Sequence, residues 1–205
     1  MTDSNSNSRL EAFCDGVFAI ALTLLIIGIV IPSSETISTT NDLWLALQHL
    51  LPSVFAFLLS FIIIFISWVN HHGTLKLIDK SSPHFIYANG FLLLMIVFLP
   101  FPTALLSEYL FTDLAAPAVV LYAAINVLLT IAWILLFQAA LKPNPLTKND
   151  KATLIARAGQ LSAYWALAIY MLCAILAFWF PQAVAFLLGA IWIFWLIISI
   201  SVKAE

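Results

Sequence analysis

The few side chains in this sequence that could do chemistry gather near one end of its apolar segments. Asp15 follows Arg9 and Glu11 at the start of the first segment. The pair 71–72 in "SWVNHHGTLK" ends the second segment, and Asn89 in "HFIYANG" stands near the start of the third. Imidazole and carboxylate groups at one depth can bind a metal ion, relay a proton or hydrogen-bond to one another.

These three chemistries make different demands. A metal site at His71 and His72 needs further ligands, and Asp15 is the one convincing addition, so we expect no metal and no cofactor. A proton relay stays open as a form of modulation, because histidine titrates near neutrality. An acid inside a membrane normally points toward a partner. We therefore favour a structural polar cluster, in which Arg9 and Asp15 bond to His71 or His72 and to Asn89.

The composition indicates an integral membrane protein. Of the 205 residues, 63% are hydrophobic and only 9% are charged, whereas soluble domains carry about 25% charged residues. No run of Lys or Arg indicates a nucleic-acid partner. Cys14 and Cys173 both lie inside apolar segments, which predicts neither a disulfide nor a metal site.

The apolar segments predict an all-α protein with six transmembrane helices. A hydrocarbon core about 30 Å thick needs roughly 20 apolar residues. Six stretches meet this length, at about 10–31, 44–69, 85–107, 116–141, 155–179 and 183–202. We expect residues 9–205 to form one transmembrane domain in the lipid bilayer, and residues 1–8 to be a disordered tail.

The basic residues predict the orientation. All eight Lys and Arg residues fall in or beside the loops 70–84 and 142–154 and the two tails. The positive-inside rule then places both termini in the cytoplasm, for a protein of the plasma (inner) membrane. The outer loops carry four acids and no base (Glu35, Asp42, Glu108 and Asp113). These acids form a cation-attracting vestibule or merely follow the exclusion of bases.

A helical wheel divides the first segment into two faces. The apolar residues within about 40° of Ile20 are Phe13, Gly16, Leu24, Ile27 and Ile31. Thr23 lies at the edge of this stripe, whereas Asp15 lies about 140° away beside Glu11. Such stripes are mostly ordinary core packing, and the residues alone leave a pore lining as the minority interpretation.

The opening of the first segment resembles a family signature. It reads "R-x3-F-C-D-G-x-F-A-I-A-L-T-L-L" and is similar to the first helix of the transmembrane protein 175 family, in which R-x3-F-S-D occurs. The resemblance covers about the first half of the chain, on Arg9, Phe13, Asp15, Ala19, Ile20, Thr23, Trp68, His71, Asn89 and "LPFPT" at 99–103. Cys14 replaces the family's serine, and a thiol is the weaker hydrogen-bond donor.

This resemblance implies a potassium-permeable cation channel that assembles as a homotetramer, with the first helix around a central pore. K+ would be the permeant ion. The implied pore residues are Ile20, Thr23, Leu24 and Ile27, and the implied structural network is Arg9, Phe13, Asp15, Trp68, His71 and Asn89. Rings of Ile20 would form a hydrophobic gate that closes by dewetting, with moderate K+ selectivity.

Other function classes fit the sequence less well. A secondary transporter or proton-modulated cation permease is the main alternative, but no charged residue lies at the centre of any predicted span. Enzyme motifs such as HExxH and GxSxG are absent from the sequence, so we expect no enzyme. No segment carries spaced arginines, which predicts a leak conductance with weak voltage dependence.

Overall fold

The computed structural model describes the backbone of residues 4–201 and the side chains of residues 7–197. The regular elements of this part of the chain are all helices, joined by loops and turns, and one isolated antiparallel bridge pairs Ile78 with Thr147. The elements in chain order are α1 (Ser4–Leu24), the 3-10 turn η1 (Leu25–Gly28), α2 (Thr40–His49), α3 (Leu51–Leu77), α4 (Pro83–Phe98), α5 (Pro100–Tyr109), α6 (Ala115–Ala140), α7 (Asp150–Leu176) and α8 (Pro181–Ser201).

Within the described residues, five helical stretches are long and apolar enough to cross a membrane, so the chain is a multi-pass membrane protein. They are Asn7–Gly28, Leu51–Leu77, Pro83–Tyr109, Ala115–Ala140 and Asp150–Leu176. The third of them joins α4 and α5 into one span, as expected. The apolar stretch Pro181–Ile197 of α8 is shorter, so the sixth span stays a prediction.

Two predicted boundaries are wrong. The second span was expected at 44–69, but α2 ends at His49 and α3 runs from Leu51 to Leu77. Pro52 in the first turn of α3 has no backbone N–H to continue a helix from α2, which accounts for the break. Residues 70–77, expected in a loop, form the last two turns of α3, so both histidines are helical.

The first helix also differs from its expected bounds. It begins at Ser4, so the tail predicted to be disordered is helical from that residue, while residues 1–3 lie outside the described part. At the other end α1 gives way to η1 after Leu24, and residues 29–31 are not helical. Ile31 therefore lies outside the helix, and the helical wheel does not predict the direction of its side chain.

Several helix starts follow local sequence signals. Thr39 caps α2 in a capping box, in which its hydroxyl accepts from the Asp42 N–H and the Asp42 carboxylate accepts from the Thr39 N–H. Ser82 caps α4, whose first residue is proline. Asn149 caps α7 by accepting from the Ala152 N–H at 2.8 Å.

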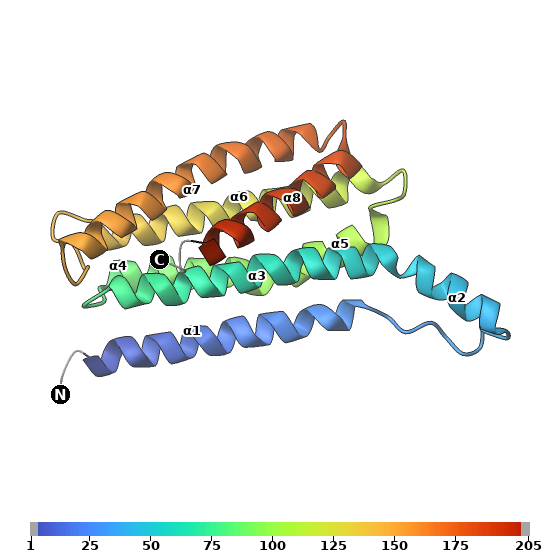
Figure 1. The fold of residues 1–205 in the computed structure, drawn as a ribbon, viewed down its shortest axis with the longest axis horizontal. Helices are drawn as coiled ribbons and strands as arrows, with labels where there is room; N and C mark the ends of the chain where they lie inside the picture. The colour runs from blue at the N-terminus through green and yellow to red at the C-terminus, as the bar shows by residue number, and fades with distance from the viewer. Residues whose placement is uncertain (1–3, 202–205) are drawn as a thin grey trace.

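The long helices run side by side along the longest axis of the molecule (Figure 1). Helix α6 packs against α4, α5, α7 and α8, while α1 lies at one edge of the bundle and contacts α3 and α4. This edge position leaves one side of α1 without a partner inside the protomer.

A cluster of hydroxyl groups joins three helices in the buried middle of the bundle. The Ser60 hydroxyl of α3 lies 2.6 Å from that of Thr103 in α5 and 2.8 Å from that of Tyr122 in α6. All three side chains are buried. Because the three hydroxyl groups hydrogen-bond to one another, their burial costs little free energy. Thr103 belongs to "LPFPT", which gives that stretch a structural role.

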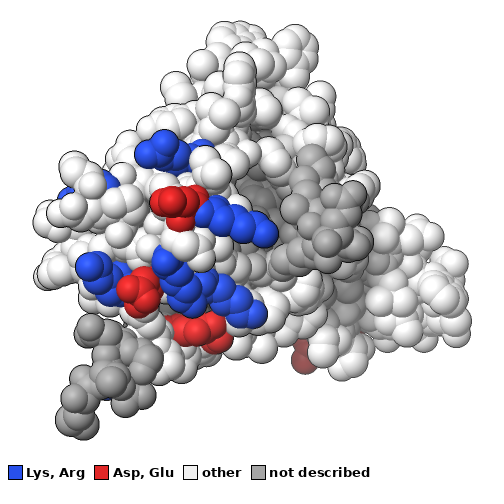
Figure 2. Space-filling model, turned by 60° about the vertical axis from the view of Figure 1, so that its left-hand side comes forward, with Lys and Arg blue, Asp and Glu red and all other residues white. Residues whose placement is uncertain are grey.

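The basic side chains gather at the end of the bundle that holds the start of α1 and the loops α3–α4 and α6–α7 (Figures 1 and 2). The lysines of these loops and their borders are Lys76, Lys80, Lys142, Lys148 and Lys151. The two loops are bonded together, from Lys148 N–H to Leu77 C=O at 2.9 Å and from Asp79 N–H to Leu146 C=O at 2.8 Å.

Candidate functional site

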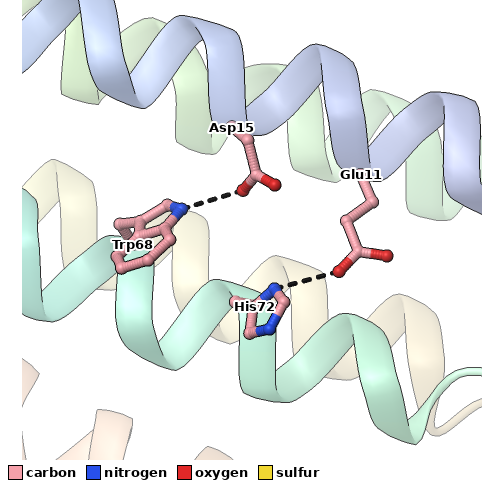
Figure 3. Close-up of polar contacts among 4 residues, drawn as sticks. All are labelled: Glu11, Asp15, Trp68 and His72. Carbon is pink, nitrogen blue, oxygen red and sulfur yellow. Dashed lines mark hydrogen bonds and ion pairs between the residues drawn. The ribbon is translucent and has the colours of Figure 1, made fainter.

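Two polar contacts join α1 to α3 near the basic end (Figure 3). The indole N–H of Trp68 donates to Oδ1 of Asp15 at 2.8 Å. One turn away, Nδ1 of His72 lies 2.9 Å from Oε1 of Glu11, without the alignment of a hydrogen bond. Within each helix the two residues are four apart, which places them on one face. The Trp68 and His72 rings also stack, with centroids 6.0 Å apart.

A second polar chain lies deeper and joins α1, α3 and α4. Nε2 of His71 lies 2.6 Å from Oδ1 of Asn89, and Nδ2 of Asn89 donates to the Cys14 sulfur at 3.1 Å. An amide oxygen only accepts, so Nε2 carries the imidazole proton. All three side chains are buried, and the ring of Phe18 packs against His71. The chain fixes the position of α1 in the interior.

The two faces of α1 differ completely in burial. Cys14, Phe18, Ala21 and Leu25 are at most 3% exposed and belong to the core. On the opposite face, Ile20 is 60%, Leu24 42% and Ile27 70% exposed. An apolar stripe of this length is unfavourable in water, so it must face lipid, another subunit or a dewetted pore.

Thr23 is the polar member of the exposed face. Its hydroxyl donates to the backbone oxygen of Ile20 at 2.9 Å. Because the hydroxyl proton is used within the helix, the oxygen lone pairs remain available to accept a hydrogen bond or to contact a cation. A threonine in this state is a possible cation ligand.

A pocket of about 390 Å³ opens at the other end of α1, away from the basic loops. Gly28 lines it from η1, Val30 from the segment after η1, His49 from α2, and Ser107 and Glu108 from α5. It therefore brings one of the four expected outer acids close to the end of the exposed stripe.

Comparisons with known proteins decide the family. The sequence profile described as "Endosomal/lysosomal potassium channel TMEM175" matches residues 9–100. A potassium channel of Chamaesiphon minutus is 43% identical over 138 residues, which are 67% of this chain and 68% of that protein. The chain belongs to the TMEM175 family.

Other relatives agree with this assignment. A potassium channel of Streptomyces collinus is 40% identical over 135 residues, 66% of this chain and 63% of that protein, so the match covers somewhat less than two thirds of the relative. The crystal structure of a lysosomal potassium-selective channel TMEM175 homolog from Chamaesiphon minutus matches with a TM-score of 0.82 and 35% identity, over 95% of this chain and 98% of that one. These relatives are named as channels, in agreement with the expectation that the chain is not an enzyme.

The predicted polar network is only partly assembled. Trp68, His71 and Asn89 lie in the cluster with Asp15, but Asp15 bonds to Trp68 rather than to a histidine or Asn89. Its carboxylate faces α3 one turn away from the deeper chain.

Two predicted members lie outside the cluster. Phe13 is 63% exposed on the apolar stripe. Arg9 is exposed, and within residues 7–197 no hydrogen bond or ion pair links it to the cluster. The wheel places Arg9 on the apolar face, and the helix is regular there, so its side chain starts from the wrong side to reach the acids.

Glu11 belongs to the cluster but was not among the residues predicted for the polar network. It forms the contact with His72, for which Asp15 was the expected partner. The signal was present, because Glu11 and Asp15 are four residues apart and share the polar face of the wheel. The role of Cys14 also differs from expectation. Its sulfur accepts a hydrogen bond from Asn89, so its weakness as a donor does not matter here.

Proposed function

We propose that this chain is a potassium-permeable, moderately K+-selective leak channel, with the exposed face of α1 around the pore of a homotetramer. The exposed stripe of Ile20, Leu24 and Ile27 carries the proposal. In a family whose bacterial relatives are named potassium channels, a peripheral helix with one uncovered apolar face supports a lining shared between subunits.

The constriction would be hydrophobic. Four copies of Ile20 around an axis form an apolar collar that water leaves readily when the collar narrows, which gates the pore by dewetting. An ion must shed water to pass such a collar, and K+ holds its water less tightly than Na+. The sequence has no TVGYG carbonyl filter, so the preference is moderate.

Thr23 would supply the polar contact beside the collar. Its hydroxyl proton is donated to Ile20 C=O, so four oxygen atoms could face the ion with their lone pairs. The two contacts to α3 and the chain through Asn89 then serve to hold α1 in place against the bundle. In this proposal the polar cluster supports the pore and does not line it.

The gathering of lysines at one end supports a cytoplasmic position for both termini in the plasma membrane. The pocket with Glu108 would then open to the outside, where an acid raises the local cation concentration. No span has spaced arginines, which supports a leak conductance with weak voltage dependence.

The test is the substitution Ile20→Asn in purified protein reconstituted into a planar bilayer. An amide wets the collar, so Na+ permeability should rise relative to K+. A tenfold preference corresponds to about 1.4 kcal/mol, and its loss moves the reversal potential under opposed K+ and Na+ gradients toward zero. Ile169→Asn on α7 is the matched control, because Ile169 is 40% exposed but lies far along the chain on another helix.

Three outcomes would contradict the proposal. An unchanged permeability ratio in Ile20→Asn would remove Ile20 from the constriction. An equal change in Ile169→Asn would point to a general disturbance of the fold. Flux that saturates and follows a proton gradient, without unitary current steps, would favour a secondary transporter.

A further inference from the structure

Three groups that bind metal ions converge between α1 and α3. Glu11 and Asp15 extend from α1 and His72 extends from α3 (Figure 3). Their ligand atoms, two carboxylate oxygens and one imidazole nitrogen, all lie within 4.8 Å of one another. A single ion between them would reach all three after small side-chain rotations.

The arrangement leaves the required lone pairs available. Trp68 donates to Oδ1 of Asp15 and does not contact the second carboxylate oxygen (Figure 3). Nδ1 of His72 is buried, points toward Glu11 at 2.9 Å and forms no aligned hydrogen bond. The Trp68 bond resembles the outer contacts that orient metal-binding carboxylates.

The cluster is also open to ions from water. The side chains of His72 and Glu11 are 35% and 32% exposed, and Asp15 is partly exposed as well. Glu11 and Asp15 lie about two and three turns into α1, and His72 lies in the last two turns of α3, toward the basic end of the bundle. A hydrated ion therefore needs no path through the core.

We propose that Glu11, Asp15 and His72 bind a divalent transition-metal ion that bridges α1 and α3. One imidazole nitrogen with two carboxylates suits Co2+ or Zn2+, whereas Mg2+ and Ca2+ take oxygen ligands. Three protein ligands leave positions for water. The site is distinct from the exposed stripe of α1 and does not depend on the proposed channel function.

Titration of the full-length protein in detergent with Co2+ tests the site. The visible absorption of Co2+ reports its ligands, and competition by Zn2+ reports the affinity. Wild-type protein should bind one Co2+ per chain. His72→Gln should abolish this band, and Asp15→Asn should do the same while its amide oxygen still accepts from Trp68. Because two variants remove a ligand independently, the test does not depend on the folding of either variant alone.

Two further variants distinguish a specific metal site from non-specific attraction of Co2+ by surface charge. Trp68→Phe removes the orienting bond and should weaken binding about 10-fold. His84→Gln, at an exposed histidine of α4 outside the cluster, should bind Co2+ like the wild type. Wild-type protein without a Co2+ band, or folded His72→Gln and Asp15→Asn variants with unchanged affinity, would overturn the proposal. An excess of Mg2+ that displaces Co2+ would also overturn it.

Discussion

Asn89→Ala is the substitution from which we expect the largest loss of stability in the polar cluster. Asn89 is 1% exposed and connects three helices, through Oδ1 to His71 on α3 and through Nδ2 to Cys14 on α1. Alanine removes both bonds. It leaves Nε2–H of His71 buried without an acceptor, beside an Nδ1 atom that already has no partner among the described residues.

The expected magnitude follows from these contacts. A buried donor left without a partner costs about 1–3 kcal/mol. The contact to sulfur is weak, and hydrogen bonds inside membrane proteins average about 0.6 kcal/mol. Loss of the carboxamide also leaves a cavity of roughly the size of one or two methyl groups, which costs about 1 kcal/mol each. We therefore expect a total of about 3–5 kcal/mol.

Thermal unfolding of the purified protein, followed by tryptophan fluorescence, measures this effect. For a protein of this size 1 kcal/mol shifts Tm by about 2–4 °C, so Asn89→Ala should lower Tm by about 6–20 °C. Asn70→Ala is the matched control, because Asn70 is exposed at the same end of α3. Its effect should stay within about 0.5 kcal/mol.

Asn89→Leu separates the hydrogen bonds from the volume. Leucine fills most of the space but cannot accept a hydrogen bond from His71. Asn89→Leu should therefore show about half of the loss of stability of Asn89→Ala. If Asn89→Ala melts within 1–2 °C of Asn70→Ala, a range of about 0.5 kcal/mol, the chain through Asn89 does not hold α1. If Asn89→Leu restores the wild-type Tm, the loss arises from the cavity alone.

The other predictions concern single helices. An added Cβ at Gly159 would lie 2.7 Å from the Phe137 ring, whereas one at Gly73 meets nothing within 4 Å. Gly159→Ala should therefore lower the free energy of unfolding and Gly73→Ala raise it, each by about 1 kcal/mol, which thermal unfolding measures as a lower and a higher Tm. Hydrogen bonds from Thr39 and its neighbour lower the pKa of Asp42. The carboxylate then stabilises the start of α2 above about pH 4 and loses this effect as the pH falls. Hydrogen exchange in α2, corrected for intrinsic rates, should therefore increase in acid. In Asp42→Asn the corrected exchange should be independent of pH.

Much of the fold could be predicted from local sequence signals. Apolar length determines which segments can span a membrane, and five of the six predicted stretches agree with helices apart from their ends, the last of them with α8. The break between α2 and α3 was missed because the apolar run continues through it, although Pro52 is of the residue type favoured in the first turn of a helix and marks the start of α3. Hydropathy alone does not show where one helix ends and the next begins.

The sequence by itself determined the two faces of α1, because the wheel depends only on the angle per residue. Ile20 and Leu24 lie on the exposed face and Asp15 faces α3, as the spacing predicts. Only the tertiary structure decided the partners within the cluster. These depend on the rotation and axial shift of α3 against α1, which no local spacing encodes. That packing pairs Glu11 with His72 and turns His71 inward to Asn89.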